Sequence, residues 1–136
     1  MIGSIKKILF TGSLKGQYLS ELIRDLSDTL NDENIELYCY SQSNDQIDIP
    51  NAQTIEETNI SDMDLIVSIG GDGTMLQSSK LASIYSIPIT GINKGRLGFL
   101  TDINPELVSE AIQEIIHGEY QTESRMLLDV KILNED

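Results

Sequence analysis

Short apolar runs alternate with helical patterns along most of this chain, and this alternation constrains its fold more than any other feature. The strand-like runs, rich in β-branched or aromatic residues, cover residues 6–10, 35–40, 64–69 and 87–92. Helical spacing or helix start and stop signals mark residues 17–30, 74–85 and 105–117. Alternation of this kind predicts a parallel sheet with helices on its faces.

Two segments do not follow the alternation. Residues 41–58 are polar, contain Pro50 and have no steady period, so we expect mostly loop there. Residues 120–133 begin a new alternating pattern that is typical of an antiparallel strand without partners. We therefore expect a Rossmann-like, three-layer α/β domain over residues 1–118. Residues 119–136 would then begin a truncated, β-rich second domain.

Local signals set the expected helix ends. We expect the second helix to begin at Thr74, with Leu76 among its core residues. Before the third helix, Asn104 suits the N-cap and Pro105 the first turn, and Gly118 suits the stop.

Composition narrows the classes of partner. The 136 residues suffice for one domain with a real core, and the apolar content of 40% argues against disorder. The net charge is −13, with no Lys or Arg between Arg24 and Lys80, which argues against nucleic acid or an anionic membrane as a main partner. No apolar stretch has the length of a membrane span, and the N-terminus lacks the features of a signal peptide. With Cys39 as its single cysteine, we expect a cytoplasmic protein.

Three glycines around one carboxylate, at the exit of the third expected strand, carry the strongest functional signal. The run reads Gly70-Gly71-Asp72-Gly73-Thr74 and leads into a helix. Glycines let the main chain approach a ligand closely, and a helix start offers free N–H groups and a positive dipole end to an anion. The run therefore indicates nucleotide chemistry.

Two generic phosphate motifs do not match. Residues 12–17 are not a P-loop, because no Gly-Lys-Ser/Thr follows at the required spacing. Residues 71–76 end in leucine where the dinucleotide fingerprint needs a small residue. We therefore expect neither a Walker-type ATPase nor a standard Rossmann dehydrogenase.

The glycine-rich turn resembles that of kinases that phosphorylate a hydroxyl of a small molecule: phosphofructokinases, diacylglycerol and sphingosine kinases, and NAD kinases. A second loop separates these families. Residues 91–101 read Gly-Ile-Asn-Lys-Gly-Arg-Leu-Gly-Phe-Leu-Thr, which resembles the second signature of NAD kinases. Met75-Leu76-Gln77 follows the first motif, where lipid kinases usually have a Glu-Val type continuation. The chain thus resembles the N-terminal part of an NAD kinase.

The resemblance implies a reaction. Asp72 would be the general base that takes the proton from the 2′-hydroxyl of the adenosine ribose of NAD. That oxygen would attack the terminal phosphate of ATP, or of a polyphosphate, to give NADP. Mg²⁺ would accompany ATP, and no residue is expected to bind a metal directly.

The resemblance also implies binding residues. Gly71 and Gly73, like Asp72 between them, would lie against phosphate or ribose, and Thr74 would cap the helix or touch phosphate. Phe99 would pack against the adenine, with Leu76 lining the same pocket. Plainer interpretations stay open: a carboxylate that stabilises the helix dipole, an aromatic residue of the core, and a simple cap.

Other landmarks of the family do not occur in the chain. In NAD kinases an Asn-Asn-Glu or Asn-Asn-Asp motif and a Thr-Pro-Thr-Gly segment come from the second domain. We therefore expect the parent protein to be an NAD kinase, binding small nucleotides as a homo-oligomer, and this chain to be a fragment that is inactive alone. Two alternatives stay open: a non-catalytic nucleotide-binding or assembly module, and a fragment of a diacylglycerol or sphingosine-type lipid kinase.

Overall fold

The computed structural model describes residues 4–12, 17–40, 49–94 and 98–134. Its strands are β1 (Lys7–Gly12), β2 (Glu36–Tyr40), β3 (Ala52–Ile55), β4 (Leu65–Gly70) and β5 (Ile89–Asn93). Its α-helices are α1 (Gln17–Asp32), α2 (Asp72–Tyr85) and α3 (Val108–Ile116), and its 3₁₀ helices are η1 (Glu57–Asp62) and η2 (Pro105–Leu107). None of the helices in these ranges has the length and apolar character that crossing a membrane requires.

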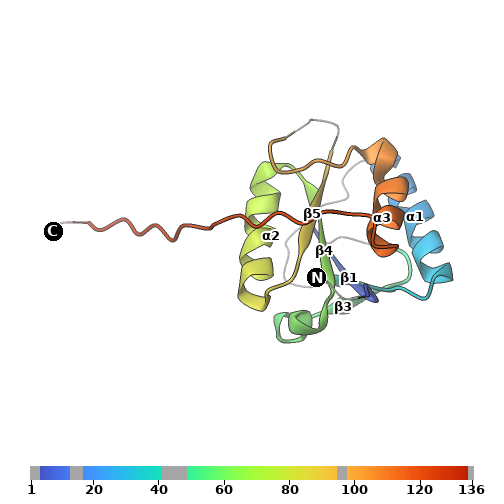
Figure 1. The fold of residues 1–136 in the computed structure, drawn as a ribbon, viewed down its shortest axis with the longest axis horizontal. Coiled ribbons are helices and arrows are strands. Elements are labelled where there is room, and N and C mark those ends of the chain that lie inside the picture. Colours follow the sequence, from blue (N-terminus) through green and yellow to red (C-terminus); the bar gives the residue numbers. More distant parts are fainter. Residues whose placement is uncertain (1–3, 13–16, 41–48, 95–97, 135–136) are drawn as a thin grey trace.

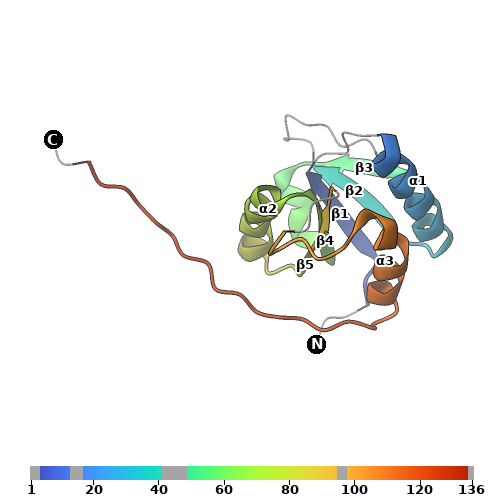
Figure 2. The same ribbon diagram turned by 90° about the horizontal axis from the view of Figure 1, so that it is seen from above.

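The five strands form one parallel sheet in the order β3-β2-β1-β4-β5, with helices on both faces (Figures 1 and 2). Helices α1 and α3 pack together on one face, and α2 covers the other (Figure 2). The chain winds outward from the central pair in both directions, from β1 through α1 to β2 and from β4 through α2 to β5. The predicted three-layer α/β fold is confirmed, and all the strands end on the same side of the sheet.

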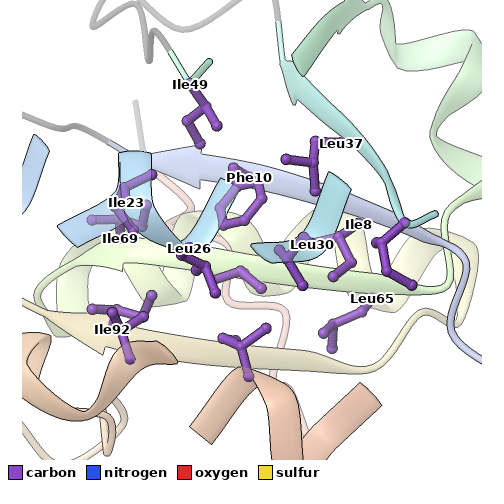
Figure 3. Close-up of a cluster of buried hydrophobic side chains, with 14 of the residues drawn as sticks. Ile8, Phe10, Ile23, Leu26, Leu30, Leu37, Ile49, Leu65, Ile69 and Ile92 are labelled. Atoms are coloured by element: carbon purple, nitrogen blue, oxygen red, sulfur yellow. The ribbon is translucent and has the colours of Figure 1, made fainter. Parts of the chain in front are cut away.

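Each face of the sheet has its own core, because successive strand residues point to opposite faces. In β1, Ile8 and Phe10 join the cluster beneath α1 and α3, whereas Leu9 joins the cluster beneath α2. Figure 3 shows the first cluster, where Leu26 and Leu30 of α1 lie against the strands. Strand β4 is buried at every position, as expected for a central parallel strand covered on both faces.

The polar segment before the third expected strand contains a strand that the sequence did not reveal. Strand β3 pairs in parallel with β2, and Ile55 lies opposite Tyr40. Only Ile55 among its four residues is buried, which explains why the segment has no apolar period. The prediction of mostly loop is therefore wrong at residues 52–55, while residues 41–48 lie outside the described residues.

Helix α2 begins two residues earlier than expected, with Gly71 as its N-cap. Thr74 therefore neither begins nor caps the helix. The predicted core residue Leu76 is exposed, and the buried residues of the helix are Ser78 and Ala82. The prediction for Leu76 is wrong because this side chain lies on the exposed side of the helix, whereas Ser78 and Ala82 are buried and Leu81 and Tyr85 pack partly buried against the core.

The third expected helix is divided into η2 and α3. Pro105 lies in the first turn of η2, as predicted. Gly118, with φ of +83°, follows the end of α3 at the expected stop. Asn104 occupies the N-cap position but makes no side-chain cap hydrogen bond, because its side-chain oxygen accepts one from Asn93 instead.

Residues 120–134 extend away from the domain and form neither helix nor strand (Figures 1 and 2). Their large apolar side chains are exposed, namely Met126, Leu127, Leu128, Val130, Ile132 and Leu133. The strand expected at residues 120–133 is not formed, since a strand needs a hydrogen-bonded neighbour and this segment has none among the described residues.

Candidate functional site

Three neighbouring strand ends lie side by side on the sheet's carboxyl side. Strand β1 ends at Gly12, β4 at Gly70 and β5 at Asn93. Gly70 pairs in register with Asn93, and Gly12 pairs with Ile69. In open α/β sheets, ligands bind outside the strand ends where the winding changes direction, which here is between β1 and β4. The candidate site consists of these strand ends, the turn from β4 into α2, and the described part of the loop after β5, residues 98–104.

Gly12 belongs to this region, although the sequence analysis assigned it no role. Its φ is +100°, and a Cβ at this position would overlap the carbonyl oxygen of Ile69. Only glycine therefore lets β1 approach β4 so closely at the point where the winding reverses. In the sequence, this role of Gly12 is indicated by its position just after an apolar strand.

The first glycine-rich loop leads from β4 into the N-terminus of α2 and presents main chain rather than side chains. A Cβ on Gly71 or Gly73 would meet no atom within 4 Å, so both face open space. The N-cap makes no side-chain cap hydrogen bond, which leaves first-turn N–H groups for water or an anion. Gly70 differs, because a Cβ there would lie 2.6 Å from Thr74 Oγ1.

Asp72 connects this loop to the second glycine-rich loop. Its Oδ2 accepts a hydrogen bond from the N–H of Phe99 and its Oδ1 from the N–H of Leu100, each at 2.9 Å. Hydrogen bonds to a carboxylate favour the charged form. The N–H groups of Leu100 and then Phe99 therefore hold the pKa of Asp72 below its ordinary value, although burial acts in the opposite direction. Asp72 is accordingly a carboxylate near neutral pH.

Asn93 anchors the second loop where that loop leaves the sheet. Its main-chain N–H donates to the carbonyl oxygen of Ile103 at 3.0 Å. Its side-chain Nδ2 donates to the carbonyl oxygen of Thr101 at 3.3 Å and to Asn104 Oδ1 at 3.1 Å. Ile103 in turn pairs with Ile92 of β5 as a parallel bridge. These bonds hold the returning end of the loop beside the strand from which it started.

Two apolar residues of the candidate site are exposed rather than packed. Phe99 is 91% exposed and Leu76 is 54% exposed. The interpretation of Phe99 as an ordinary core residue is therefore wrong, and its ring is accessible to a ligand. Of the two basic residues in this loop, Lys94 is exposed and Arg96 lies outside the described residues.

Three buried hydroxyls join α2 to the sheet beneath the site. Ser78 Oγ lies 2.8 Å from Thr11 Oγ1 and donates to Ser68 Oγ at 3.1 Å or to the carbonyl oxygen of Thr74 at 3.0 Å. The cluster joins β1, β4 and the first turns of α2. Sequence reasoning did not find it, because a serine on a helix gives no sign of what it faces.

The described residues do not form a metal site of their own. In residues 4–12, 17–40, 49–94 and 98–134, no three His, Cys, Asp or Glu side chains gather closely enough to hold a metal ion. Mg²⁺ binds readily through substrate phosphates and water with only one or two carboxylates.

Comparison with known proteins assigns these loops to a family. Residues 13–120 match the family model described as the ATP-NAD kinase N-terminal domain. The chain belongs to the NAD kinase family. An NAD kinase of Legionella pneumophila (strain Corby) is 34% identical over 120 residues, which cover 88% of this chain and 41% of that protein. An NAD kinase of Buchnera aphidicola subsp. Baizongia pistaciae is 48% identical over 73 residues, which cover 54% of this chain and 25% of that protein.

Structural comparison supports the fold. A crystal structure of yeast NADH kinase complexed with NADH matches with a TM-score of 0.63 and 21% identity, over 86% of this chain and 39% of that chain. At this identity the likeness concerns the fold alone. The chain spans less than half the length of these relatives.

Proposed function

We propose that this chain is the N-terminal part of an NAD kinase, which transfers a phosphoryl group from ATP or polyphosphate to the 2′-hydroxyl of the adenosine ribose of NAD. The observation that carries the proposal is the position of Asp72. This ionised carboxylate lies in the first turn of α2, among exposed glycines, and is bonded to the loop that carries an exposed phenylalanine. Family membership supports the same reaction.

In this proposal Asp72 accepts the ribose proton while it keeps both loop hydrogen bonds. A carboxylate has about four lone-pair sites, and the two N–H donors occupy one site on each oxygen. A free site therefore stays available to a ribose hydroxyl. The lowered pKa makes Asp72 a weak base, but phosphoryl transfer depends mainly on positioning and electrostatic stabilisation.

The remaining site residues would hold the nucleotide. Exposed main chain at Gly71 and Gly73 would approach the phosphates or ribose, with Thr74 in the same helix turn. Exposed Phe99 would stack on the adenine, with Leu76 beside it. Mg²⁺ would arrive with ATP and neutralise phosphate charge. Cytoplasmic location, homo-oligomerisation and partners limited to small nucleotides belong to the same proposal for the whole protein.

The test measures NADP formation from NAD, ATP and Mg²⁺ by the protein that carries this chain. We expect Asp72→Asn to lower kcat by about 10²–10⁴-fold, the usual value of general-base help. Asp102→Asn is the matched control, because Asp102 is an exposed carboxylate of the same loop. Equal turnover by native protein and Asp72→Asn would exclude Asp72 as the base.

The same measurements separate the alternatives. Saturable binding of ATP or NAD without turnover, measured by calorimetry, would favour a non-catalytic nucleotide-binding module. Phosphorylation of a diacylglycerol or sphingosine but not of NAD would favour a lipid kinase. The relatives described above are NAD kinases, so no comparison favours the lipid reaction.

A further inference from the structure

The second glycine-rich loop contains a glycine whose role the fold does not otherwise explain. What restricts this position, Gly98, is space, because a Cβ there would overlap Asp72 Oδ1 and lie 2.8 Å from Asp72 Cγ.

The space beside Gly98 is filled by two side chains of the candidate site. Thr101 Oγ1 would lie 2.8 Å from the same Cβ, on the side opposite its methyl group, which faces Gly91. Thr101 is fully buried, and its hydroxyl has no hydrogen-bond partner in the described part of the chain. An added Cβ would press on the carboxylate that accepts the N–H groups of Phe99 and Leu100.

We propose that Gly98 is a positioning residue for Asp72, and that together they latch the second loop onto α2. The missing side chain at Gly98 admits the carboxylate, and the carboxylate then holds the main chain of Phe99 and Leu100. The latch rests on the proposed function for its purpose. It would fix the carboxylate of Asp72 relative to the ring of Phe99. The group that faces the ribose and the group that faces the adenine would then be positioned together.

The latch depends on the charge of Asp72, and main-chain donors rather than charged side chains lower the pKa of this residue. The charged residues on the packed elements are Lys80 of α2 and Lys94 and Asp102 of the second loop, with Arg96 outside the described residues. Lys80 lies two helical turns beyond Asp72, roughly 12 Å along the axis. Loss of the two N–H bonds should therefore return the pKa of Asp72 toward its ordinary value.

The decisive measurement is amide hydrogen exchange at Phe99 and Leu100 in this chain at neutral pH, without nucleotide. We expect Gly98→Ala to accelerate exchange at both amides by about tenfold or more, since a hydrogen bond to a charged acceptor is lost. An NMR titration of the Asp72 carboxyl should show a higher midpoint in the variant. Gly118→Ala is the control, because a Cβ there would meet no atom within 4 Å and the position follows α3, on the other face of the sheet from α2. It should leave the Asp72 midpoint unchanged.

Unchanged exchange and an unchanged midpoint in Gly98→Ala would overturn the latch. If Gly98→Ala does not fold, Asp72→Asn decides, because it removes the charge without adding volume. If the amides of Phe99 and Leu100 exchange as slowly in Asp72→Asn as in the unsubstituted chain, the proposal is equally overturned. Hydrogen exchange is measured without substrate, whereas the proposed function is tested by turnover. A failure of the latch proposal is therefore distinguishable from a failure of the proposed function. In an active protein, Gly98→Ala should also move the acidic limb of the pH–rate profile upward.

Discussion

At the scale of single residues, this site depends on glycines, because the space of a missing side chain is occupied by atoms of a neighbouring residue. Gly12, Gly70 and Gly98 each make room for a different neighbour: a carbonyl group, a threonine and a carboxylate. Asp72 occupies the space beside Gly98 and accepts hydrogen bonds from the N–H groups of Phe99 and Leu100. Substitutions at these positions should therefore differ in predictable ways.

Asp72 should make stability depend on acidic pH. Its pKa is lowered in the folded state, so its contribution to the free energy of unfolding is fully present above the ordinary Asp pKa of about 3.9. The contribution is lost as the pH falls through the lower folded pKa. Urea unfolding at pH 7 and in this acidic range should show a smaller pH dependence for Asp72→Asn than for the native chain. An identical pH dependence would contradict the inferred hydrogen bonding.

Gly12→Ala should be among the most destabilising glycine substitutions. It combines a φ of +100° with overlap against main-chain atoms of Ile69, which cannot move independently of β4. We expect a loss of more than about 2 kcal/mol in the free energy of unfolding, read from the midpoint in urea. Gly118→Ala is the control, because φ is +83° but the space is open, and about 1 kcal/mol is expected. Equal losses would show that overlap at Gly12 is relieved.

At the scale of elements, α2 meets the sheet through a buried hydroxyl as well as through apolar side chains. Its buried residues are Ser78 and Ala82, and Leu76 and Ile84 are exposed. The helix begins two residues after β4 ends, so its N-terminus lies at the end of that strand. The site geometry is thus a consequence of how this helix packs.

Ser78→Ala should destabilise the domain although it removes one oxygen atom. The change leaves the buried hydroxyls of Thr11 and Ser68 without their shared partner. We expect a loss of about 1–3 kcal/mol in urea unfolding. Ser79→Ala is matched, since its hydroxyl bonds only the carbonyl oxygen of Met75 one turn earlier, and it should change stability by less than about 0.5 kcal/mol. Similar values for both serines would mean that the buried cluster contributes nothing specific.

Most of the strands and helices were predicted from the sequence. Strands β1, β2, β4 and β5 and all three α-helices were expected within a few residues of their ends, because each has its own apolar period or cap signals. Strand β3 was missed because one buried residue, Ile55, is too little for a period. The motifs located Asp72 and Phe99, but nothing local linked the carboxylate of one to the N–H of the other.

At the scale of the whole molecule, the chain consists of a packed α/β domain and an extended segment. Residues 120–134 carry six exposed large apolar side chains that pack on nothing in the described structure. An exposed apolar segment of this kind promotes association between chains. The division of the chain at residue 118 stays a prediction.

Removal of residues 121–136 should leave the domain intact and reduce association. The segment adds no core residue, so the midpoint of thermal unfolding should stay within a few degrees of its native value. Sedimentation velocity at several concentrations should show self-association of the full chain and less of it after truncation. A large fall in the thermal midpoint would instead mean that the segment packs against the domain.

The sequence by itself determined local features of this protein: the four strands β1, β2, β4 and β5, the three α-helices, and the glycines that surround Asp72. These depend on short-range periodicity and on the backbone freedom of single residues. Only the tertiary structure decided the strand order, the pairing of β3, the space that Gly98 leaves and the bonds that lower the pKa of Asp72. Those features join residues far apart in the chain, and their energies exist only once the sheet has brought the two loops together.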